Sequence, residues 1–257
     1  MEPLVTFDVV DGIGHLRLRE AARGNPVSLP SVLELLERVQ EARRSGVGVL
    51  LLSAEGRFFC VGGDLEEFRS SEDPESLVED IAGTMHRVIA QLVRMDAVVV
   101  VAVNGGSAGG GTPLIFAGDV IVAAESARIT LAYTRTGLSP DGGSTVLIPP
   151  TFGLHRTLQM ALLNTTIDAE EARALGLFAE VVPDAELADR AMALCRKLAA
   201  GPVDSLIASK HLIRANVPAP ESAMEQEARS ISYLVARPNA QEGMRAFFEK
   251  RKPVFPN

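Results

Sequence analysis

Two glycine clusters carry the first chemical signal in this sequence. One is Asn104–Thr112, with three adjacent glycines after the apolar run Val98–Val103, and the other is Gly62-Gly63, after the apolar residues Phe58–Val61. A glycine between a strand and a helix lets the backbone approach a bound molecule and leaves N–H groups free to donate. Two such junctions could each direct one N–H toward a common point. That pair would form an oxyanion hole, which stabilises charge developing on a carbonyl oxygen.

A nucleotide-binding loop is the main chemical alternative for a glycine cluster. Gly105, Gly110 and Thr112 have the spacing of a phosphate-binding loop, but Gly111 stands where such a loop needs its lysine. No G-x-G-x-x-G motif opens a helix after the first strand, which argues against a dinucleotide site. Glycines that serve only close packing of a helix remain an open alternative.

Four separated motifs resemble the enoyl-CoA hydratase/isomerase (crotonase) family. In chain order they are Phe59–Leu65, Val103–Gly111, Ala169–Pro183 and Glu242–Lys252. The resemblance covers essentially the whole chain. It implies an α/β fold, a crotonase-like spiral of ββα repeats with a C-terminal helical trimerisation region. It also implies an acyl-CoA thioester substrate, in which CoA is part of the substrate and no separate cofactor is needed, and assembly as a homotrimer or a dimer of trimers.

The resemblance further implies which residues form the site. The backbone N–H groups of Gly63 and Gly110 would bind the thioester oxygen and stabilise an enolate. Lys250 would approach the CoA phosphates, often those bound to a neighbouring subunit. The other positions expected to contact the substrate are Ala22, Gly24, Gly62, Asp64, Leu65, Pro113 and Tyr133.

Two of these positions depart from the pattern of the family's hydratases. Hydratases place glutamates where this sequence has Pro113 and Tyr133. Proline cannot move a proton, and a tyrosine with an ordinary pKa of about 10 is a poor base at neutral pH. Efficient hydration of the crotonase type is therefore not expected.

Asp141 is the remaining candidate for proton transfer. In isomerases of the family an aspartate at this position shuttles the proton, and Leu131–Thr134 with Pro140–Thr145 look most like the phenylacetate-pathway isomerase branch. Pro-Asp-Gly is also a good turn sequence that needs no chemistry. If Asp141 is the base, it must lie in a pocket dry enough to raise its pKa toward neutrality. The resemblance then implies migration of a C=C bond, and the alternatives are a hydratase with a non-standard base and a catalytically silent acyl-CoA binder.

Composition excludes several other classes of protein. The 257 residues carry a net charge of -8, which argues against nucleic acid as a partner. The apolar runs are far shorter than the ~18 residues of a membrane span, and the first residues do not read as a signal peptide. Two cysteines and four histidines show no metal-ligand spacing, so no metal is expected, and we expect Cys60 to be a packed thiol and the histidines to be structural. A cytoplasmic setting fits best.

The elements that must position these residues follow from hydrophobic periodicity. The pattern predicts five elements before the strand Val98–Val103: the two strands of a hairpin, an amphipathic helix, a buried strand and a long helix. In this order they are Leu4–Val9, Ile13–Leu18, Ser31–Arg44, Val47–Ser53 and roughly residues 75–94. It predicts a further helix that begins near Ala108, two short strands at Asp119–Ala124 and Arg128–Leu131, and mostly helix from Pro150. We expect an α/β core over residues 1–200 and a helical region over residues 201–257.

Overall fold

The computed structural model describes residues 2–216 and 220–256, which form ten strands, twelve α-helices and four short 3-10 helices. The strands are β1 Val5–Val10, β2 Ile13–Leu18, β3 Val49–Ala54, β4 Phe58–Cys60, β5 Val98–Val103, β6 Gly106–Ala108, β7 Val120–Ala124, β8 Arg128–Thr130, β9 Ile167–Asp168 and β10 Glu180–Val182. The α-helices are α1 Leu29–Ser45, α2 Leu65–Ser70, α3 Pro74–Val93, α4 Thr112–Phe116, α5 Ser144–Leu147, α6 Pro149–Phe152, α7 Leu154–Leu163, α8 Ala169–Ala174, α9 Leu187–Ala199, α10 Val203–Arg214, α11 Pro220–Val235 and α12 Pro238–Phe248. The 3-10 helices are η1 Ala21–Arg23, η2 Gly109–Gly111, η3 Tyr133–Thr136 and η4 Asp184–Glu186.

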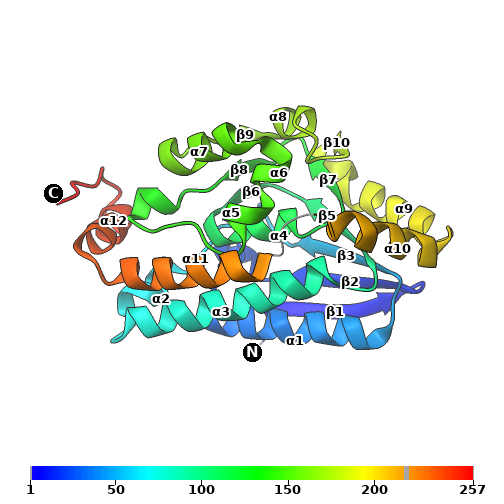
Figure 1. Ribbon diagram of the computed structural model, residues 1–257, viewed down its shortest axis with the longest axis horizontal. Coiled ribbons are helices and arrows are strands. Elements are labelled where there is room, and N and C mark those ends of the chain that lie inside the picture. The colour runs from blue at the N-terminus through cyan, green and yellow to red at the C-terminus, as the bar shows by residue number, and fades with distance from the viewer. Residues whose placement is uncertain (1, 217–219, 257) are drawn as a thin grey trace.

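The strands form two sheets that follow one repeating rule. The larger sheet has the order β1-β2-β3-β5-β7-β10, and the smaller sheet has the order β4-β6-β8-β9. In each of the pairs β3/β4, β5/β6 and β7/β8, the first strand joins the larger sheet and the second joins the smaller one. Corresponding strands of successive pairs are parallel. This is the predicted spiral of strand–strand–helix units, with helices between successive pairs (Figure 1).

Both faces of the larger sheet are covered. On β3, Leu50 and Leu52 belong to the main core with α1 and α3, whereas Val49 and Leu51 belong to a second core that includes α9. Because side chains alternate between the faces of a strand, burial of both faces needs an unbroken apolar run. All six residues of β5, Val98–Val103, are buried, as that argument requires.

The last three helices pack directly on the elements that precede them. Lys210 of α10 is buried, and its Nζ donates to the carbonyl oxygen of Ala97 at 2.8 Å and pairs with Asp119 at 2.8 Å. Helix α11 lies along α3 (Figure 1). The last strand among the described residues, β10, ends at Val182, and the elements described after it are helices. Their division into a core of residues 1–200 and a region of residues 201–257 stays a prediction.

Most predicted elements are confirmed to within two residues, and one is wrong. The helix expected to begin near Ala108 begins at Thr112, because Gly106–Ala108 form strand β6 and Gly109–Gly111 form the 3-10 helix η2. The short segment is extended because it pairs with β4 on one side and β8 on the other. Tertiary pairing therefore overrides local preference here, and α4, with five residues, carries little helix dipole.

Two features are absent from the described part of the chain. Within residues 2–216 and 220–256, no helix is long and apolar enough to cross a membrane. The same residues contain no group of three or more His, Cys, Asp or Glu side chains placed to hold a metal ion.

Candidate active site

The two glycine clusters meet because their strands are neighbours. β4 and β6 are parallel, with Phe58 opposite Gly106 and Cys60 opposite Ser107. The segments that follow parallel neighbours leave the sheet at the same edge, so Gly62 arrives beside Ala108. The two backbones touch: a Cβ atom on Gly62 would lie 2.7 Å from the carbonyl oxygen of Ala108, and the φ of Gly62 is +89°. Both constraints require glycine at this position.

Each junction presents a free backbone donor. Among the described residues, no acceptor is found for the N–H group of Gly63, whose neighbours pair with Val27 instead. Gly110 lies in the first turn of η2, where N–H groups have no acceptor within the helix. Both glycines line the same cavity. Two backbone N–H groups at one cavity are what an oxyanion hole would require.

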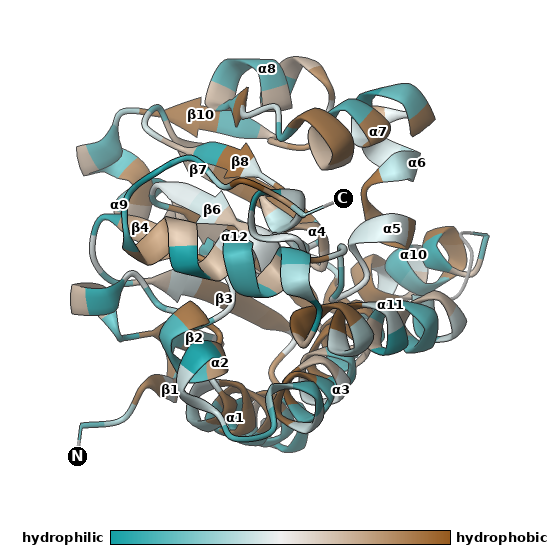
Figure 2. Ribbon diagram, turned by 90° about the vertical axis from the view of Figure 1, so that its left-hand side faces the viewer, coloured by the Kyte–Doolittle hydropathy of each residue, from teal (hydrophilic) through white to brown (hydrophobic). Residues whose placement is uncertain are grey.

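The cavity has a volume of about 490 Å³ and walls that are mostly apolar. It extends from the glycine junctions between α3 and α11 and reaches α12. Figure 2 looks at the side of the molecule where α2 and α12 lie. The apolar side chains that line the cavity include Phe68, Val78, Ile81, Met85, Leu138, Ile231, Phe247 and Phe248. A volume of this size suits a small-molecule acyl group rather than a polymer.

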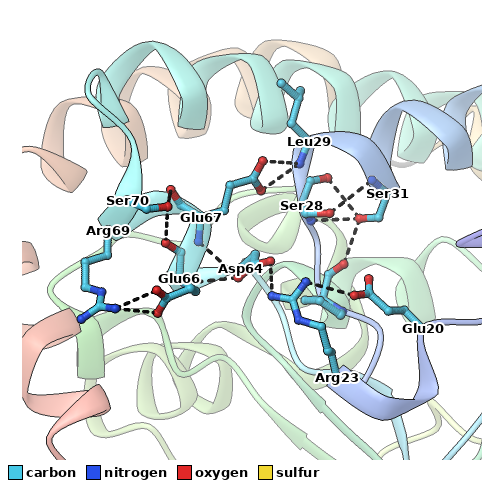
Figure 3. Close-up of polar contacts among 11 residues, drawn as sticks. Glu20, Arg23, Ser28, Leu29, Ser31, Asp64, Glu66, Glu67, Arg69 and Ser70 are labelled. Carbon is cyan, nitrogen blue, oxygen red and sulfur yellow. Dashed lines mark hydrogen bonds and ion pairs between the residues drawn. The ribbon is translucent and has the colours of Figure 1, made fainter. Parts of the chain in front are cut away.

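Charged residues lie at the α2 edge of the cavity (Figure 3). Asp64 caps α2, since its carboxylate accepts from the N–H groups of Glu66 and Glu67. The same carboxylate pairs with Arg23, which also pairs with Glu20 at 3.0 Å. On the outer face of α2, Arg69 lies 4.4 Å from the ring centroid of Phe248 in α12, so a cation–π contact joins the two helices.

Asp141 is a buried carboxyl group beside Gly110. Its side chain is 7% exposed and lines the cavity. A Cβ atom on Gly110 would lie 3.7 Å from Oδ1 of Asp141, and the hydroxyl of Tyr133 donates to that Oδ1 at 2.6 Å. The pKa of Asp141 is raised to about 6: burial is the largest cause, the hydrogen bond from Tyr133 opposes it, and the charge of Glu227 adds to the rise. A carboxyl group with this pKa can accept and release a proton near neutral pH.

The residues at the two glutamate positions of the hydratases do not supply a base. Burial and the neighbouring Asp141 carboxylate raise the pKa of Tyr133 well above its ordinary value, so its hydroxyl stays a donor. Pro113 is buried in α4 and packs behind the loop, because a Cβ atom on Gly142 would lie 2.9 Å from its Cγ. Of the three candidate positions, only Asp141 therefore carries a group that can act as a base near neutral pH.

The predicted site residues divide into two groups by position. The cavity is lined by Gly62, Gly63, Asp64, Leu65, Gly110, Tyr133 and Asp141. The residues that lie outside its lining are Ala22, Gly24, Pro113 and Lys250. Ala22 and Gly24 flank Arg23, which does line the cavity, and Lys250 is exposed directly after α12. No bound molecule tests the substrate contacts expected of this second group.

Two residues that hold the Asp141 loop were not predicted. His86 of α3, which we expected to be structural, accepts from the N–H of Gly142 at 3.2 Å, and Glu227 of α11 accepts from the N–H of Gly143 at 2.6 Å. They lie 56 and 84 residues from these partners in the chain. No local pattern connects positions so far apart. Cys60 is buried against Gly111, and burial raises the pKa of its thiol to about 12, in agreement with a packing role.

Known proteins are similar to this chain in both sequence and fold. The family model described as enoyl-CoA hydratase/isomerase matches residues 8–257. The 1,2-epoxyphenylacetyl-CoA isomerase of Escherichia coli is 33% identical over 262 residues, covering 99% of each chain. A "Probable enoyl-CoA hydratase" of Rhodobacter capsulatus is 32% identical over 252 residues, 98% of this chain and 97% of that one. A solved enoyl-CoA hydratase from Mycobacterium avium subsp. paratuberculosis matches with a TM-score of 0.90 and 28% identity, covering 99% of each chain.

Proposed function

The chain belongs to the enoyl-CoA hydratase/isomerase (crotonase) family, as its motifs predicted, and on that premise we propose that it isomerises an enoyl-CoA thioester. The observation that carries the proposal is the position of Asp141. Its carboxyl group lies in a largely apolar cavity beside Gly110, and its pKa is raised to about 6. The relative named 1,2-epoxyphenylacetyl-CoA isomerase supports isomerisation of a CoA thioester, whereas the relatives named as hydratases motivate the alternative.

The proposed reaction begins with the thioester oxygen at the N–H groups of Gly63 and Gly110. The ionised Asp141 removes a proton from one carbon of the acyl group, and the electrons of the broken C–H bond pass into the enolate. The two N–H groups stabilise the negative charge on its oxygen. Protonated Asp141 then returns the proton to a different carbon, so the C=C bond moves and no water is consumed.

The two oxygens of Asp141 suit this shuttle. Oδ1 accepts the hydrogen bond from Tyr133, which fixes the orientation of the carboxyl group. Oδ2 accepts none of the hydrogen bonds found within residues 2–216 and 220–256, so it is available for proton transfer. The apolar walls exclude water that would compete for the enolate.

Hydration of the hydratase type uses carboxylates at the positions of Pro113 and Tyr133, and neither position carries one. Neither Pro113 nor the neutral Tyr133 can activate water. If Asp141 protonates the carbon atom of the substrate, a second carboxylate is needed to activate the water. The alternatives are a hydratase that uses Asp141 and an ordered water, and a silent acyl-CoA binder. These three functions differ in their products, so one incubation can separate them.

Incubation with a 3-enoyl-CoA or a ring-type enoyl-CoA in D2O tests the reaction class. We expect the shifted double bond, with deuterium incorporated into the product, to be detected by mass spectrometry. Asp8→Asn, on the exposed part of β1, is the matched control and should behave as the natural protein does. Hydration of crotonyl-CoA at an ordinary enzymatic rate would favour the hydratase, and tight binding without exchange would favour the silent binder.

The proposal extends to the CoA part of the substrate. Ala22 and Gly24 would lie along the nucleotide and pantetheine, because Arg23 between them already borders the cavity. Lys250 would approach the CoA phosphates, since it is exposed directly after α12, whose Phe247 and Phe248 line the cavity.

Self-association into a trimer or a dimer of trimers completes the proposal. Helix α7 exposes four leucines, Leu154, Leu158, Leu162 and Leu163, and α10 exposes Leu212 and Ile213. Apolar faces of this extent are typical of surfaces that a partner covers. Light scattering on a size-exclusion column is expected to give three or six times the chain mass of 27.4 kDa. A monomer mass at micromolar concentration would contradict this part of the proposal.

A further inference from the structure

The loop that carries Asp141 has little conformational restraint of its own. Gly142 and Gly143, which follow Asp141, both adopt positive φ angles of +65° and +86°. Glycine allows a wider range of backbone angles than any other residue, so an isolated loop of this sequence would sample many conformations. The direction of the Asp141 carboxyl group therefore depends on what holds the loop.

Glu227 holds this loop from the side that faces away from the cavity. Its carboxylate is 5% exposed, lies on α11 and does not line the cavity. Oε2 accepts from the N–H of Gly143 at 2.6 Å, and Oε1 accepts from the N–H of Thr145 at 2.9 Å and from the Thr145 hydroxyl. Three donors converge on one side chain that accepts through both oxygens, which is what an ionised carboxylate offers.

No cation accompanies this buried carboxylate in the described residues. The nearest basic group is Nε2 of His86, at 3.9 Å from Oε2 of Glu227. Burial lowers the pKa of His86 to about 4, so its ring is neutral at neutral pH, and Nε2 accepts from the N–H of Gly142. A buried charge without a cation is costly, and a turn needs no charge to be held in place. The charge itself calls for a functional explanation.

We infer that Glu227 is a positioning residue for proton transfer: it fixes the turn Gly142–Thr145 from behind and thereby directs the Asp141 carboxyl group at the acyl chain. The inference rests on the proposed function, in which Asp141 moves the proton. His86 restrains the amide immediately after Asp141. Neither residue touches the cavity, so both act through the loop.

The charge of Glu227 adds an electrostatic effect to this geometric one. Among the described residues, the titratable groups around the Asp141 loop are Tyr133 from η3, His86 from α3 and Glu227 from α11. His86 is neutral and Tyr133 is a donor that favours the ionised Asp141, so Glu227 is the group whose charge makes Asp141 a weaker acid. Removal of that charge should lower the pKa of Asp141.

Glu227→Gln tests the inference, with Glu225→Gln, an exposed position on the same helix, as the matched control. We expect the acid limb of the kcat profile, near pH 6 in the natural protein, to move to lower pH, because the charge of Glu227 is one cause of the raised pKa of Asp141. We also expect kcat to fall about tenfold to a hundredfold with KM nearly unchanged, because a misdirected reacting group lowers the rate without loss of substrate contacts. Glu225→Gln should change neither quantity.

A measurement that needs no turnover separates this inference from the proposed function. The 13C resonance of the Asp141 carboxyl carbon, assigned from its loss in Asp141→Asn, can be titrated in each variant. A titration midpoint that is the same in Glu227→Gln as in the natural protein, together with an unchanged kcat, would overturn the role of Glu227. If Asp141→Asn keeps full activity, the proposed function fails, whatever the midpoint of Glu227→Gln. If Glu227→Gln does not fold, Thr145→Val removes the hydroxyl donor alone, and its kcat must fall at unchanged KM for the inference to stand.

Discussion

Replacement of Asp141 by asparagine is expected to lower kcat by about 100- to 10,000-fold, the usual contribution of a positioned acid–base group. Asparagine keeps the shape of aspartate and can still accept the hydrogen bond from Tyr133. Binding of an unreactive acyl-CoA should therefore change little, since the apolar walls and the backbone donors remain. The loss should appear in kcat, measured by the ultraviolet absorbance of the conjugated thioester.

The same substitution is expected to make the fold more stable above pH 6. The pKa of Asp141 is raised from 3.8 to about 6, so the folded protein binds this proton more tightly than the unfolded chain does. The stability contributed by the protonated group is complete below pH 3.8 and is lost as the pH rises through 6. Two pKa units correspond to about 3 kcal/mol, and asparagine, which does not ionise, should recover about 1–3 kcal/mol at pH 8.

Urea unfolding at pH 8 and at pH 4.5, with equal protein concentrations, checks the stability effect. The free energy of unfolding of Asp141→Asn should exceed that of the natural protein at pH 8. The difference should shrink at pH 4.5, where most of the natural Asp141 is protonated. Loss of stability at pH 8 would show that Asp141 is a structural turn residue. Full catalytic activity of the variant would refute the proposed mechanism.

Replacement of Gly62 by alanine is expected to lower kcat/KM by about 100- to 1,000-fold, the range seen when an oxyanion donor is lost. A Cβ atom at Gly62 would lie 2.7 Å from the carbonyl oxygen of Ala108, which is closer than a non-bonded carbon and oxygen approach in folded proteins. The two junctions must therefore move apart, and with them the N–H groups of Gly63 and Gly110. A thioester oxygen could then accept a full hydrogen bond from one donor but not from both.

Gly153→Ala is the control for this substitution. Gly153 has a similar φ of +77°, but a Cβ atom there would meet nothing within 4 Å. Both variants carry the backbone strain of a positive φ, and only Gly62→Ala also separates the two junctions. Thermal unfolding measures how much the strain lowers stability, and steady-state kinetics measures the loss of kcat/KM. Equal kcat/KM values for the two variants would contradict the oxyanion hole at Gly63 and Gly110.

Local patterns were sufficient to predict most elements of the fold. The apolar run Val98–Val103 marks a strand buried on both faces, and the glycines after it mark a junction where the backbone is open to a ligand. Both signals depend on residues adjacent in the chain. Gly106–Ala108 shows the limit of local patterns, because its pairing with β4 and β8 makes it a strand where a helix was predicted.

Residues read along the chain are enough to identify the two glycine clusters, the family resemblance and the absence of both hydratase carboxylates at Pro113 and Tyr133. Each of these is a property of residue type at a given position. The resemblance also singled out Asp141, but residue type alone could not separate a turn aspartate from a proton carrier.

The chemical environment of Asp141 arises when the chain folds. Parallel pairing of β4 with β6 brought the two backbone donors together, and the packing of α3 and α11 placed His86 and Glu227 behind the loop. The pKa of a carboxyl group depends on its burial and on the charges around it, and both come from residues far away in the chain. Periodicity carries no record of those neighbours, so the burial and the raised pKa that support Asp141 as the proton carrier are visible only in the folded protein.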